Sequence, residues 1–154
     1  MNNWIKSVAL ACLLSLAGAA GAGELGTADE AVAMVNKAVA YLAEHGREQA
    51  LAEINKPKGR FVDRDLYVVV HDMHGTVLAN AQLQRMVGKD VSEVKDIDGR
   101  QFVKERLKML ATAKSGWNEF QWPNSVTQKI DRRSTYFVRE GDLVLTCGIL
   151  KKTP

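Results

Sequence analysis

The fold is decided by the segment LYVVVHDMHGTVLA, residues 66–79. Residues 66–71 are rich in β-branched and aromatic side chains and are apolar at successive positions, which is typical of a central strand buried on both faces. Asp72-Met73-His74-Gly75 has the composition of a turn, and residues 76–79 return as a second strand. This segment therefore predicts two antiparallel strands at the centre of a sheet.

Three further strands are expected in the last third of the chain, at residues 117–122, 134–139 and 143–150. Pro123-Asn124-Ser125 joins the first two of these, and Glu140-Gly141-Asp142 is a tight hairpin signal between the last two. The sheet is therefore expected to be antiparallel and to have about five strands.

Two helices are expected to pack on this sheet. Thr27 to Glu30 form a capping box, and apolar residues then recur at steps of three and four up to Leu42. Gly46 interrupts this helix, and residues 48–54 resume it. A second helix is expected from Asp98 as its N-cap, after an irregular connection over residues 81–97. Helices packed on an antiparallel sheet define an α+β domain, and long connections often cover binding sites.

Size and composition fit one globular domain. The chain has 154 residues, of which 46% are hydrophobic and 25% are charged, a composition that argues against intrinsic disorder, collagen and coiled coil. The formal net charge is only +3, and both signs are mixed along the chain. This charge pattern predicts no nucleic-acid partner.

The N-terminal segment has the layout of a secretory signal peptide. Lys6 precedes an apolar run over residues 8–20, and Ala20-Gly21-Ala22 offers a cleavage site. We expect residues 1–22 to be the signal peptide and residues 23–154 to be the exported domain, in the periplasm or secreted; an uncleaved anchor is the alternative. Cleavage leaves Cys147 as the sole cysteine, and its apolar surroundings predict a buried thiol.

Motifs for catalysis, cofactors or metals are absent from the sequence. A strand followed by a turn directs the side chains at residues 71–74 apart, whereas a transition-metal site needs converging ligands. Asp96-Ile97-Asp98-Gly99 matches part of a calcium loop but lacks the closing Glu. No nucleophile elbow, phosphate-binding glycine loop or haem-attachment pair is present. The sequence thus predicts no enzyme, no cofactor and no metal.

The residues that best fit a binding site are aromatic and basic, and they lie on two neighbouring strands. An Arg enclosed by aromatic rings offers a planar grip for a carboxylate, and the Asn124 amide and Tyr136 hydroxyl add hydrogen bonds. The alternative is that the rings belong to the core and the Arg side chains face solvent, which spacing alone favours. The residues concerned are Trp117, Phe120, Trp122, Arg132, Arg133, Tyr136 and Phe137.

The ordered set of motifs resembles the single Cache family, most closely its second single-Cache subgroup, from about residue 29 to residue 151. The motifs are YVVVHDMHGTVLA at residues 67–79, VGKD at 87–90, DIDGRQFV at 96–103, GW at 116–117, FQWPN at 120–124, RSTY at 133–136 and CGI at 147–149.

This resemblance implies a PAS-like antiparallel sheet with a long N-terminal helix, and an extracytoplasmic domain that senses small molecules, often short carboxylates. It places the pocket between the sheet and the long connection before the second helix. The family commonly has Tyr at Phe120, Lys at Arg133 and Pro at Ser125, so this chain departs from it there. Matched by motif, the implied ligand-binding residues are Phe120, Trp122, Asn124, Arg133 and Tyr136.

The resemblance also implies partners. Cache sensors usually feed a kinase or a chemotaxis module, and this chain ends soon after its last strand, so we expect it to lack its own transmembrane and output modules and to serve a membrane sensor kinase or chemoreceptor. The alternative is a non-catalytic interaction module with a vestigial pocket, whose helix from Thr27 forms a homodimer or partner surface.

Overall fold

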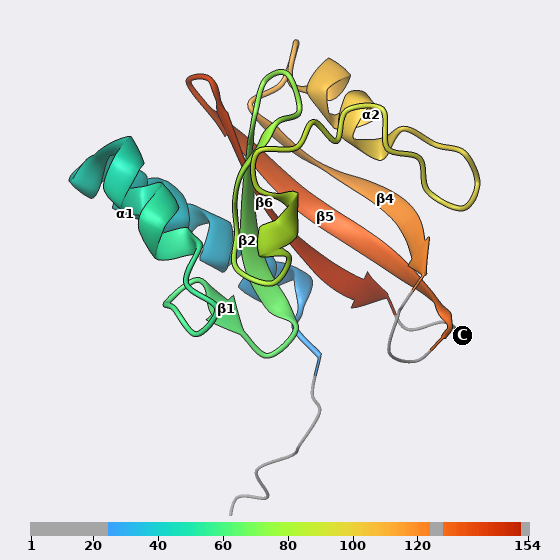
Figure 1. Cartoon of the computed structure of the whole chain (residues 1–154), viewed down its shortest axis with the longest axis horizontal. Helices are drawn as coiled ribbons and strands as arrows, with labels where there is room; N and C mark the ends of the chain where they lie inside the picture. Colours follow the sequence, from blue (N-terminus) through green and yellow to red (C-terminus); the bar gives the residue numbers. More distant parts are fainter. Residues whose placement is uncertain (1–24, 124–127, 152–154) are drawn as a thin grey trace, which may run out of the picture.

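The computed structural model describes residues 25–123 and 128–151. The predicted signal peptide and Asn124 lie outside these residues. Two helices, six strands and one 3-10 turn follow each other along the described chain (Figure 1). They are α1 (Ala28–Ile54), β1 (Val62–Asp63), β2 (Leu66–Asp72), β3 (Val77–Asn80), η1 (Gln84–Met86), α2 (Phe102–Met109), β4 (Ser115–Pro123), β5 (Ile130–Glu140) and β6 (Leu143–Lys151).

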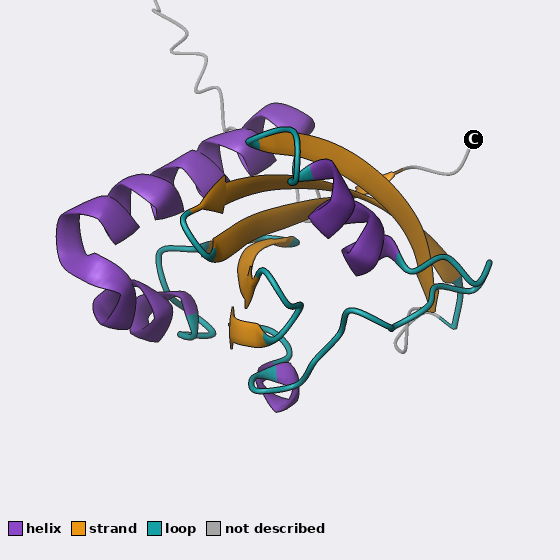
Figure 2. Cartoon of the chain, turned by 90° about the horizontal axis from the view of Figure 1, so that it is seen from above, coloured by secondary structure: helices purple, strands orange, loops and turns teal. Residues whose placement is uncertain are grey.

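The described strands form one antiparallel sheet in the order β1-β2-β6-β5-β4, and β3 pairs with β2. All five predicted strands are present, and the two-residue β1 is an addition. Helix α1 lies on one side of the curved sheet, while α2 and η1 lie on the other (Figure 2). The predicted α+β fold, with a long N-terminal helix and a second helix, is confirmed.

Helix α1 begins at the predicted capping box. The Glu30 amide donates to Thr27 Oγ1 at 3.3 Å, and the Thr27 amide donates to Glu30 Oε2 at 2.8 Å. Gly46 has φ 79° and ψ 168°, which is not helical, so α1 bends there. Both segments bury small or branched side chains against the sheet, among them Val35 and Ile54.

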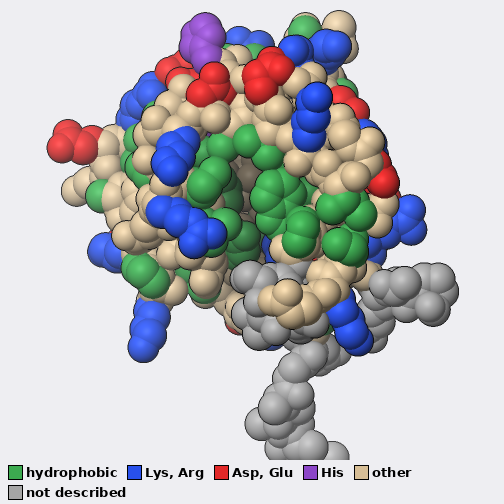
Figure 3. All heavy atoms as spheres, turned by 45° about the vertical axis from the view of Figure 1, so that its right-hand side comes forward, with side chains coloured by type: hydrophobic (Ala, Val, Ile, Leu, Met, Phe, Trp, Pro, Cys, Tyr) green, Lys and Arg blue, Asp and Glu red, His purple; other side chains and the backbone are tan. Residues whose placement is uncertain are grey.

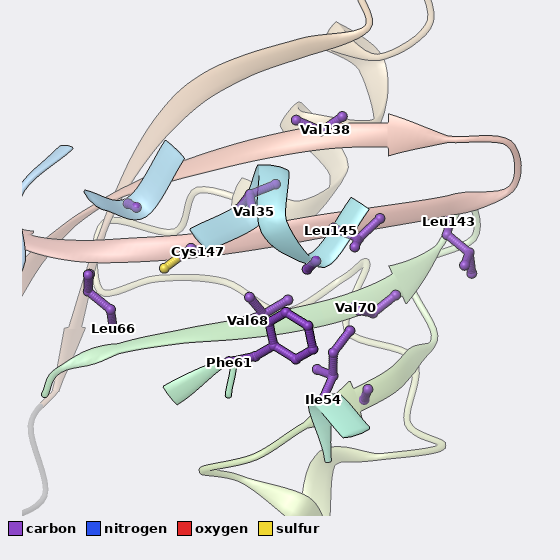
Figure 4. Close-up of a cluster of buried hydrophobic side chains, with 13 residues drawn as sticks. Val35, Ile54, Phe61, Leu66, Val68, Val70, Val138, Leu143, Leu145 and Cys147 are labelled. Atoms are coloured by element: carbon purple, nitrogen blue, oxygen red, sulfur yellow. The ribbon is translucent and has the colours of Figure 1, made fainter. Parts of the chain in front are cut away.

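The main core lies between α1 and the sheet (Figure 4). Side chains alternate between the two faces of a strand, so Leu66, Val68 and Val70 of β2 point toward α1. Cys147 of β6 belongs to this cluster and is 1% exposed, which confirms the prediction of a buried thiol. The residues labelled in Figure 4 are Val35, Ile54, Phe61, Leu66, Val68, Val70, Val138, Leu143, Leu145 and Cys147.

The second helix begins later than predicted. Asp98 is not its N-cap; the cap position is Gln101, and Asp98 lies in the preceding turn. The reason is that Asp96 Oδ1 accepts hydrogen bonds from the amides of Asp98 and Arg100, both at 2.9 Å. Asp96 Oδ2 also accepts from the Gln121 amide at 3.2 Å, which ties the connection to β4.

Candidate functional site

A pocket of about 260 Å³ lies on the face of the sheet opposite α1. The sheet forms one side, and the connection over residues 81–101 together with α2 forms the other. Figure 3 shows a hollow ringed by hydrophobic side chains, with Lys and Arg side chains farther out. The sheet residues that line the pocket are Tyr67, Val69, His71, Val77, Asn80, Phe120, Trp122, Arg133, Thr135, Thr146 and Gly148.

Arg106 is the most unusual residue of this pocket. It extends from α2 and is only 4% exposed. Its Nε and Nη2 donate to Asn118 Oδ1 of β4 at 3.4 and 3.3 Å, and the Asn118 amide nitrogen donates to the Phe102 carbonyl at 2.7 Å. The guanidinium also lies over the Phe137 ring, 5.5 Å from its centroid. Helix, strand and ring therefore hold the cation in one place.

His71 of β2 completes this network as an acceptor. Its Nδ1 lies 2.9 Å from the Asp72 carbonyl oxygen, so Nδ1 carries the proton and donates. Its Nε2 then accepts from Arg106 Nη1 at 3.2 Å. Burial, and next the positive charge of Arg106, lower the pKa of His71 to about 4. At neutral pH the imidazole is therefore uncharged and contributes no second cation.

The charge of Arg106 is not compensated by any carboxylate among residues 25–123 and 128–151. Burial lowers the pKa of its guanidinium to about 10, which leaves it protonated at neutral pH. A desolvated cation without a counter-ion is costly. An anion that enters the pocket would relieve this cost, so Arg106 is the strongest candidate for an anion-binding group.

Arg133 of β5, one of the residues implied by the motifs, also lines the pocket. Its side chain is 27% exposed, and Nη2 lies 3.6 Å from Asp131 Oδ2. Its Nε is buried and has no hydrogen-bond partner within the described chain. Arg133 thus differs from Arg106, because a nearby carboxylate already offsets its charge while one of its donors remains unused.

Aromatic rings form the wall beside Arg133. Phe120 stacks on Phe102 of α2 with centroids 4.0 Å apart, and Trp122 meets Phe102 edge-on at 6.0 Å. Both Phe120 and Trp122 line the pocket, as their predicted role requires. Phe102, from α2, also lines the pocket but is not among the ligand-binding residues that the motifs imply.

Two predicted site residues are not placed in the pocket. Tyr136 lies on the opposite face of the sheet, where its ring packs against the α1 core and Trp117. Tyr136 and Arg133 are three residues apart on one strand, and an odd separation places side chains on opposite faces. Asn124 lies outside the described residues, so its position is untested.

The sequence contained one signal for Arg106 that motif matching missed. Arg106 follows Phe102 by four residues and Val103 by three, so it shares their face of α2. An Arg within an apolar stripe that faces a sheet is either paired or functional. His71 and Asn118 gave no comparable signal, because a polar residue at one strand position is common.

Two negative findings apply to the described part of the chain. In residues 25–123 and 128–151, no cluster of three or more His, Cys, Asp and Glu side chains could ligate a metal ion. Within the same residues, no helix has the length and apolarity needed to cross a membrane.

The family is decided by sequence comparison. The profile of Single Cache domain 2 matches residues 22–147. The chain belongs to this family. The predicted family is therefore confirmed, and with it the general character of a Cache sensory domain. No curated protein matches the chain.

Solved Cache and chemotaxis domains share the fold. One is a Cache chemosensory domain described for carboxylic acid recognition, with TM-score 0.69 and 19% identity over 80% of this chain and 92% of that one. Another is a methyl-accepting chemotaxis protein from Vibrio parahaemolyticus RIMD 2210633, with TM-score 0.66 and 19% identity over 79% and 86%. A third is the periplasmic sensor domain of a chemotaxis protein, with TM-score 0.63 and 18% identity over 80% and 90%.

Proposed function

We propose that this Cache domain is an extracytoplasmic, non-catalytic sensor that binds a small carboxylate in the pocket opposite α1. The observation that carries the proposal is the buried guanidinium of Arg106, which lines an apolar pocket and has no carboxylate partner in the described chain. A carboxylate supplies the missing charge and accepts two N–H bonds side by side. The carboxylic acid recognition described for a structurally similar Cache domain supports the same ligand class.

The predicted export fits this role. A signal peptide at residues 1–22 would deliver residues 23–154 to the periplasm or beyond, where a small acid from the surroundings can reach the pocket. The bound domain would then act on a membrane sensor kinase or chemoreceptor. Chemotaxis proteins with this fold support that choice of partner.

Isothermal titration calorimetry on the exported chain tests the proposal. An acid of about five heavy atoms gains at most ~1.5 kcal/mol per atom, which limits its affinity to about micromolar. The titrations must therefore extend to millimolar acetate, propionate and pyruvate. Propionamide, which has nearly the same shape and no charge, is the ligand control and is expected not to bind.

Substitutions locate the site. Arg106→Met is expected to abolish acid binding, and Arg106→Lys is expected to weaken it, because an ammonium keeps the charge but loses the planar fork. The matched control is Arg132→Gln: Arg132 neighbours Arg133, but its side chain is 58% exposed and lies on the other face, near Glu119. If Arg106→Met is folded by circular dichroism and binds like the parent, the proposed site is rejected; if it does not fold, Arg106→Lys decides.

A further inference from the structure

The described residues that line the pocket carry positive charge and no negative charge. They include Arg85, Arg106 and Arg133, but no Asp or Glu. Asp131, 3.6 Å away, offsets the charge of Arg133. Arg85 and Arg106 have no carboxylate partner in the described chain. A cleft lined by one sign of charge attracts the opposite sign, so two uncompensated cations favour a ligand with two negative groups.

Arg106 has room for only one of these groups. A guanidinium has five N–H groups. Nε and Nη2 of Arg106 each donate to Asn118 Oδ1, and Nη1 donates to His71 Nε2. One N–H on Nη1 and one on Nη2 are then left, and a single carboxylate can accept both. A second carboxylate on the same ligand must therefore bind elsewhere in the pocket.

Asn80, at the end of β3, offers a donor on the pocket face. It is the cross-strand partner of Val69, lines the pocket with it and is 5% exposed. Its Oδ1 accepts from the amides of Gln82 and Leu83 at 3.1 and 2.8 Å, which fixes the orientation of the side-chain amide. Its Nδ2 has no acceptor in the described chain and, unlike Arg133 Nε, is not fully enclosed, so a ligand can reach it.

Arg85 places a positive charge at the mouth of the pocket, on the same connection. It lies in η1, five residues after Asn80, and its side chain is exposed while that of Met86 packs in the apolar cluster around Val77. A carboxylate between Asn80 and Arg85 keeps part of its hydration, so its desolvation costs less than full burial would. Arg106 at the buried end and Arg85 at the open end thus suit the two ends of one ligand.

The size of the pocket limits the length of such a ligand. A dry cavity of about 150 Å³ accommodates benzene, so the pocket, at about 260 Å³, holds roughly ten heavy atoms. Two carboxylates account for six of these, which leaves about four carbons between them. Asn80 pairs with Val69, so it is a diagonal neighbour of His71, about 7–8 Å away. Since His71 accepts from Arg106, a ligand of this size can reach both anchors.

We propose that the ligand is a linear dicarboxylate with about two to four methylene groups between its carboxylates. One carboxylate binds Arg106, and the methylene groups lie against apolar lining residues such as Val69. The second carboxylate accepts from Asn80 Nδ2 and lies beside the Arg85 guanidinium. Glutarate is the middle member of this class. The assignment rests on the proposed carboxylate function and narrows its ligand class.

Calorimetry on the exported chain tests the second carboxylate. Glutaramate, the monoamide of glutarate, has the same number of heavy atoms and one charge less, so it is the matched ligand control. At physiological ionic strength, where charges farther apart than about 8 Å are screened, we expect glutarate to bind at least about tenfold more tightly than glutaramate. If the gain is smaller and both ligands still require Arg106, the dicarboxylate assignment is wrong while the proposed function stands. If neither ligand and none of the short acids binds, both are wrong.

Two variants locate the second carboxylate. Asn80→Asp keeps the oxygen that accepts from the two amides but replaces the donor with a negative charge, so glutaramate is expected to bind more tightly than glutarate. Arg85→Gln is expected to lower the preference for glutarate at least about threefold. The matched control is Lys89→Gln, an equal loss of charge on the same connection at an exposed residue outside the pocket lining, which is expected to keep the parent preference.

A parent-like preference for glutarate in Asn80→Asp or in Arg85→Gln overturns the assignment. An equal loss of preference in Arg85→Gln and Lys89→Gln also overturns it, because the effect would then come from net charge and not from a contact at the mouth of the pocket. Circular dichroism checks that each variant is folded. If Asn80→Asp does not fold, Arg85→Gln decides, since its exposed side chain has no partner in the described chain.

Discussion

His71 and Arg106 form a buried pair in which the histidine accepts and the arginine donates. The geometry holds only while the imidazole is neutral, because a protonated ring has no free lone pair at Nε2. Protonation of His71 would also place a second positive charge beside a buried cation. The pocket is thus built for conditions under which this histidine stays uncharged.

This arrangement predicts an acid-sensitive stability. The pKa of His71 falls from 6.5 to about 4 on folding, mainly through burial. Between these values the unfolded chain binds a proton at this residue and the folded chain does not, so the free energy of unfolding falls as the pH drops through this range. The loss from this residue amounts to roughly 3 kcal/mol near pH 4. Urea unfolding of parent and His71→Gln at several pH values measures it.

The variant His71→Gln keeps an acceptor for Arg106 but does not titrate, so its free energy of unfolding is expected to fall less steeply toward acid pH. The exposed His74, in the turn after β2, provides the control substitution His74→Gln, which removes a histidine and leaves the His71–Arg106 pair in place. Parallel pH profiles for the parent and His71→Gln would show that His71 is not the source of the acid sensitivity.

Individual site residues were predictable only in part. Phe120, Trp122 and Arg133 come from one motif and its partner strand. Side chains alternate between the two faces of a strand, and this alternation brings all three to the same face of the sheet. The same alternation places Tyr136 on the other face, and a match of motifs does not take this alternation into account. Arg106 required knowing that the apolar stripe of α2 faces the sheet, because only then is an Arg in that stripe buried.

Gly46 divides α1 into two segments. Its φ of 79° and ψ of 168° lie in a region that is open almost solely to glycine. Apart from the two neighbouring residues and the backbone of the helix itself, no atom lies within 4 Å of the position that a Cβ would take, so space does not oppose a larger residue there. The backbone conformation alone therefore requires glycine.

Whether Gly46→Ala raises or lowers the stability of the chain tests this bend. In a continuous helix, Gly46→Ala would stabilise the chain by about 1 kcal/mol. At the observed conformation it is expected to destabilise the chain by about 1–3 kcal/mol, as measured by urea unfolding. The matched control is Ala43→Gly, at an exposed position within the regular part of the same helix, which is expected to cost about 1 kcal/mol. Stabilisation by Gly46→Ala would mean that α1 runs straight in solution.

For helices and turns, the sequence predicted the structure correctly where interactions between residues close in the chain determine it. The capping box at Thr27, the glycine at residue 46 and the hairpin at Gly141 all act within a few residues, and each was predicted in the right place. The start of α2 was predicted wrongly, because Asp96 Oδ1 accepts from the amides of Asp98 and Arg100 and holds Asp98 in a turn before the helix. A further bond from the Gln121 amide of β4, distant in sequence, to Asp96 Oδ2 ties that turn to the sheet.

The two faces of the sheet have different roles in the molecule. One side of the sheet is closed by α1 over a core that includes Cys147, and the other side holds the pocket. Since β2, β5 and β6 contribute alternate residues to both sides, a ligand in the pocket stabilises the same strands that carry the core. Ligand binding in the pocket is therefore expected to slow the opening of the core on the opposite face, and this change can be measured.

Cys147 offers that measurement. Burial raises the pKa of its thiol to about 12, so the folded chain holds it hidden and unionised, and alkylation requires the chain to open. A ligand that binds only the folded chain lowers the open fraction by a factor of 1 + [L]/Kd. Alkylation by iodoacetamide is therefore expected to slow about tenfold when the ligand is at ten times its Kd.

Ala113→Cys in a Cys147→Ala background carries an exposed thiol after α2 and is expected to react quickly whether or not ligand is present. If a ligand binds by calorimetry but leaves the alkylation rate of Cys147 unchanged, then β6 opens without release of the ligand. In that case, ligand binding in the pocket does not stabilise the core on the opposite face of the sheet.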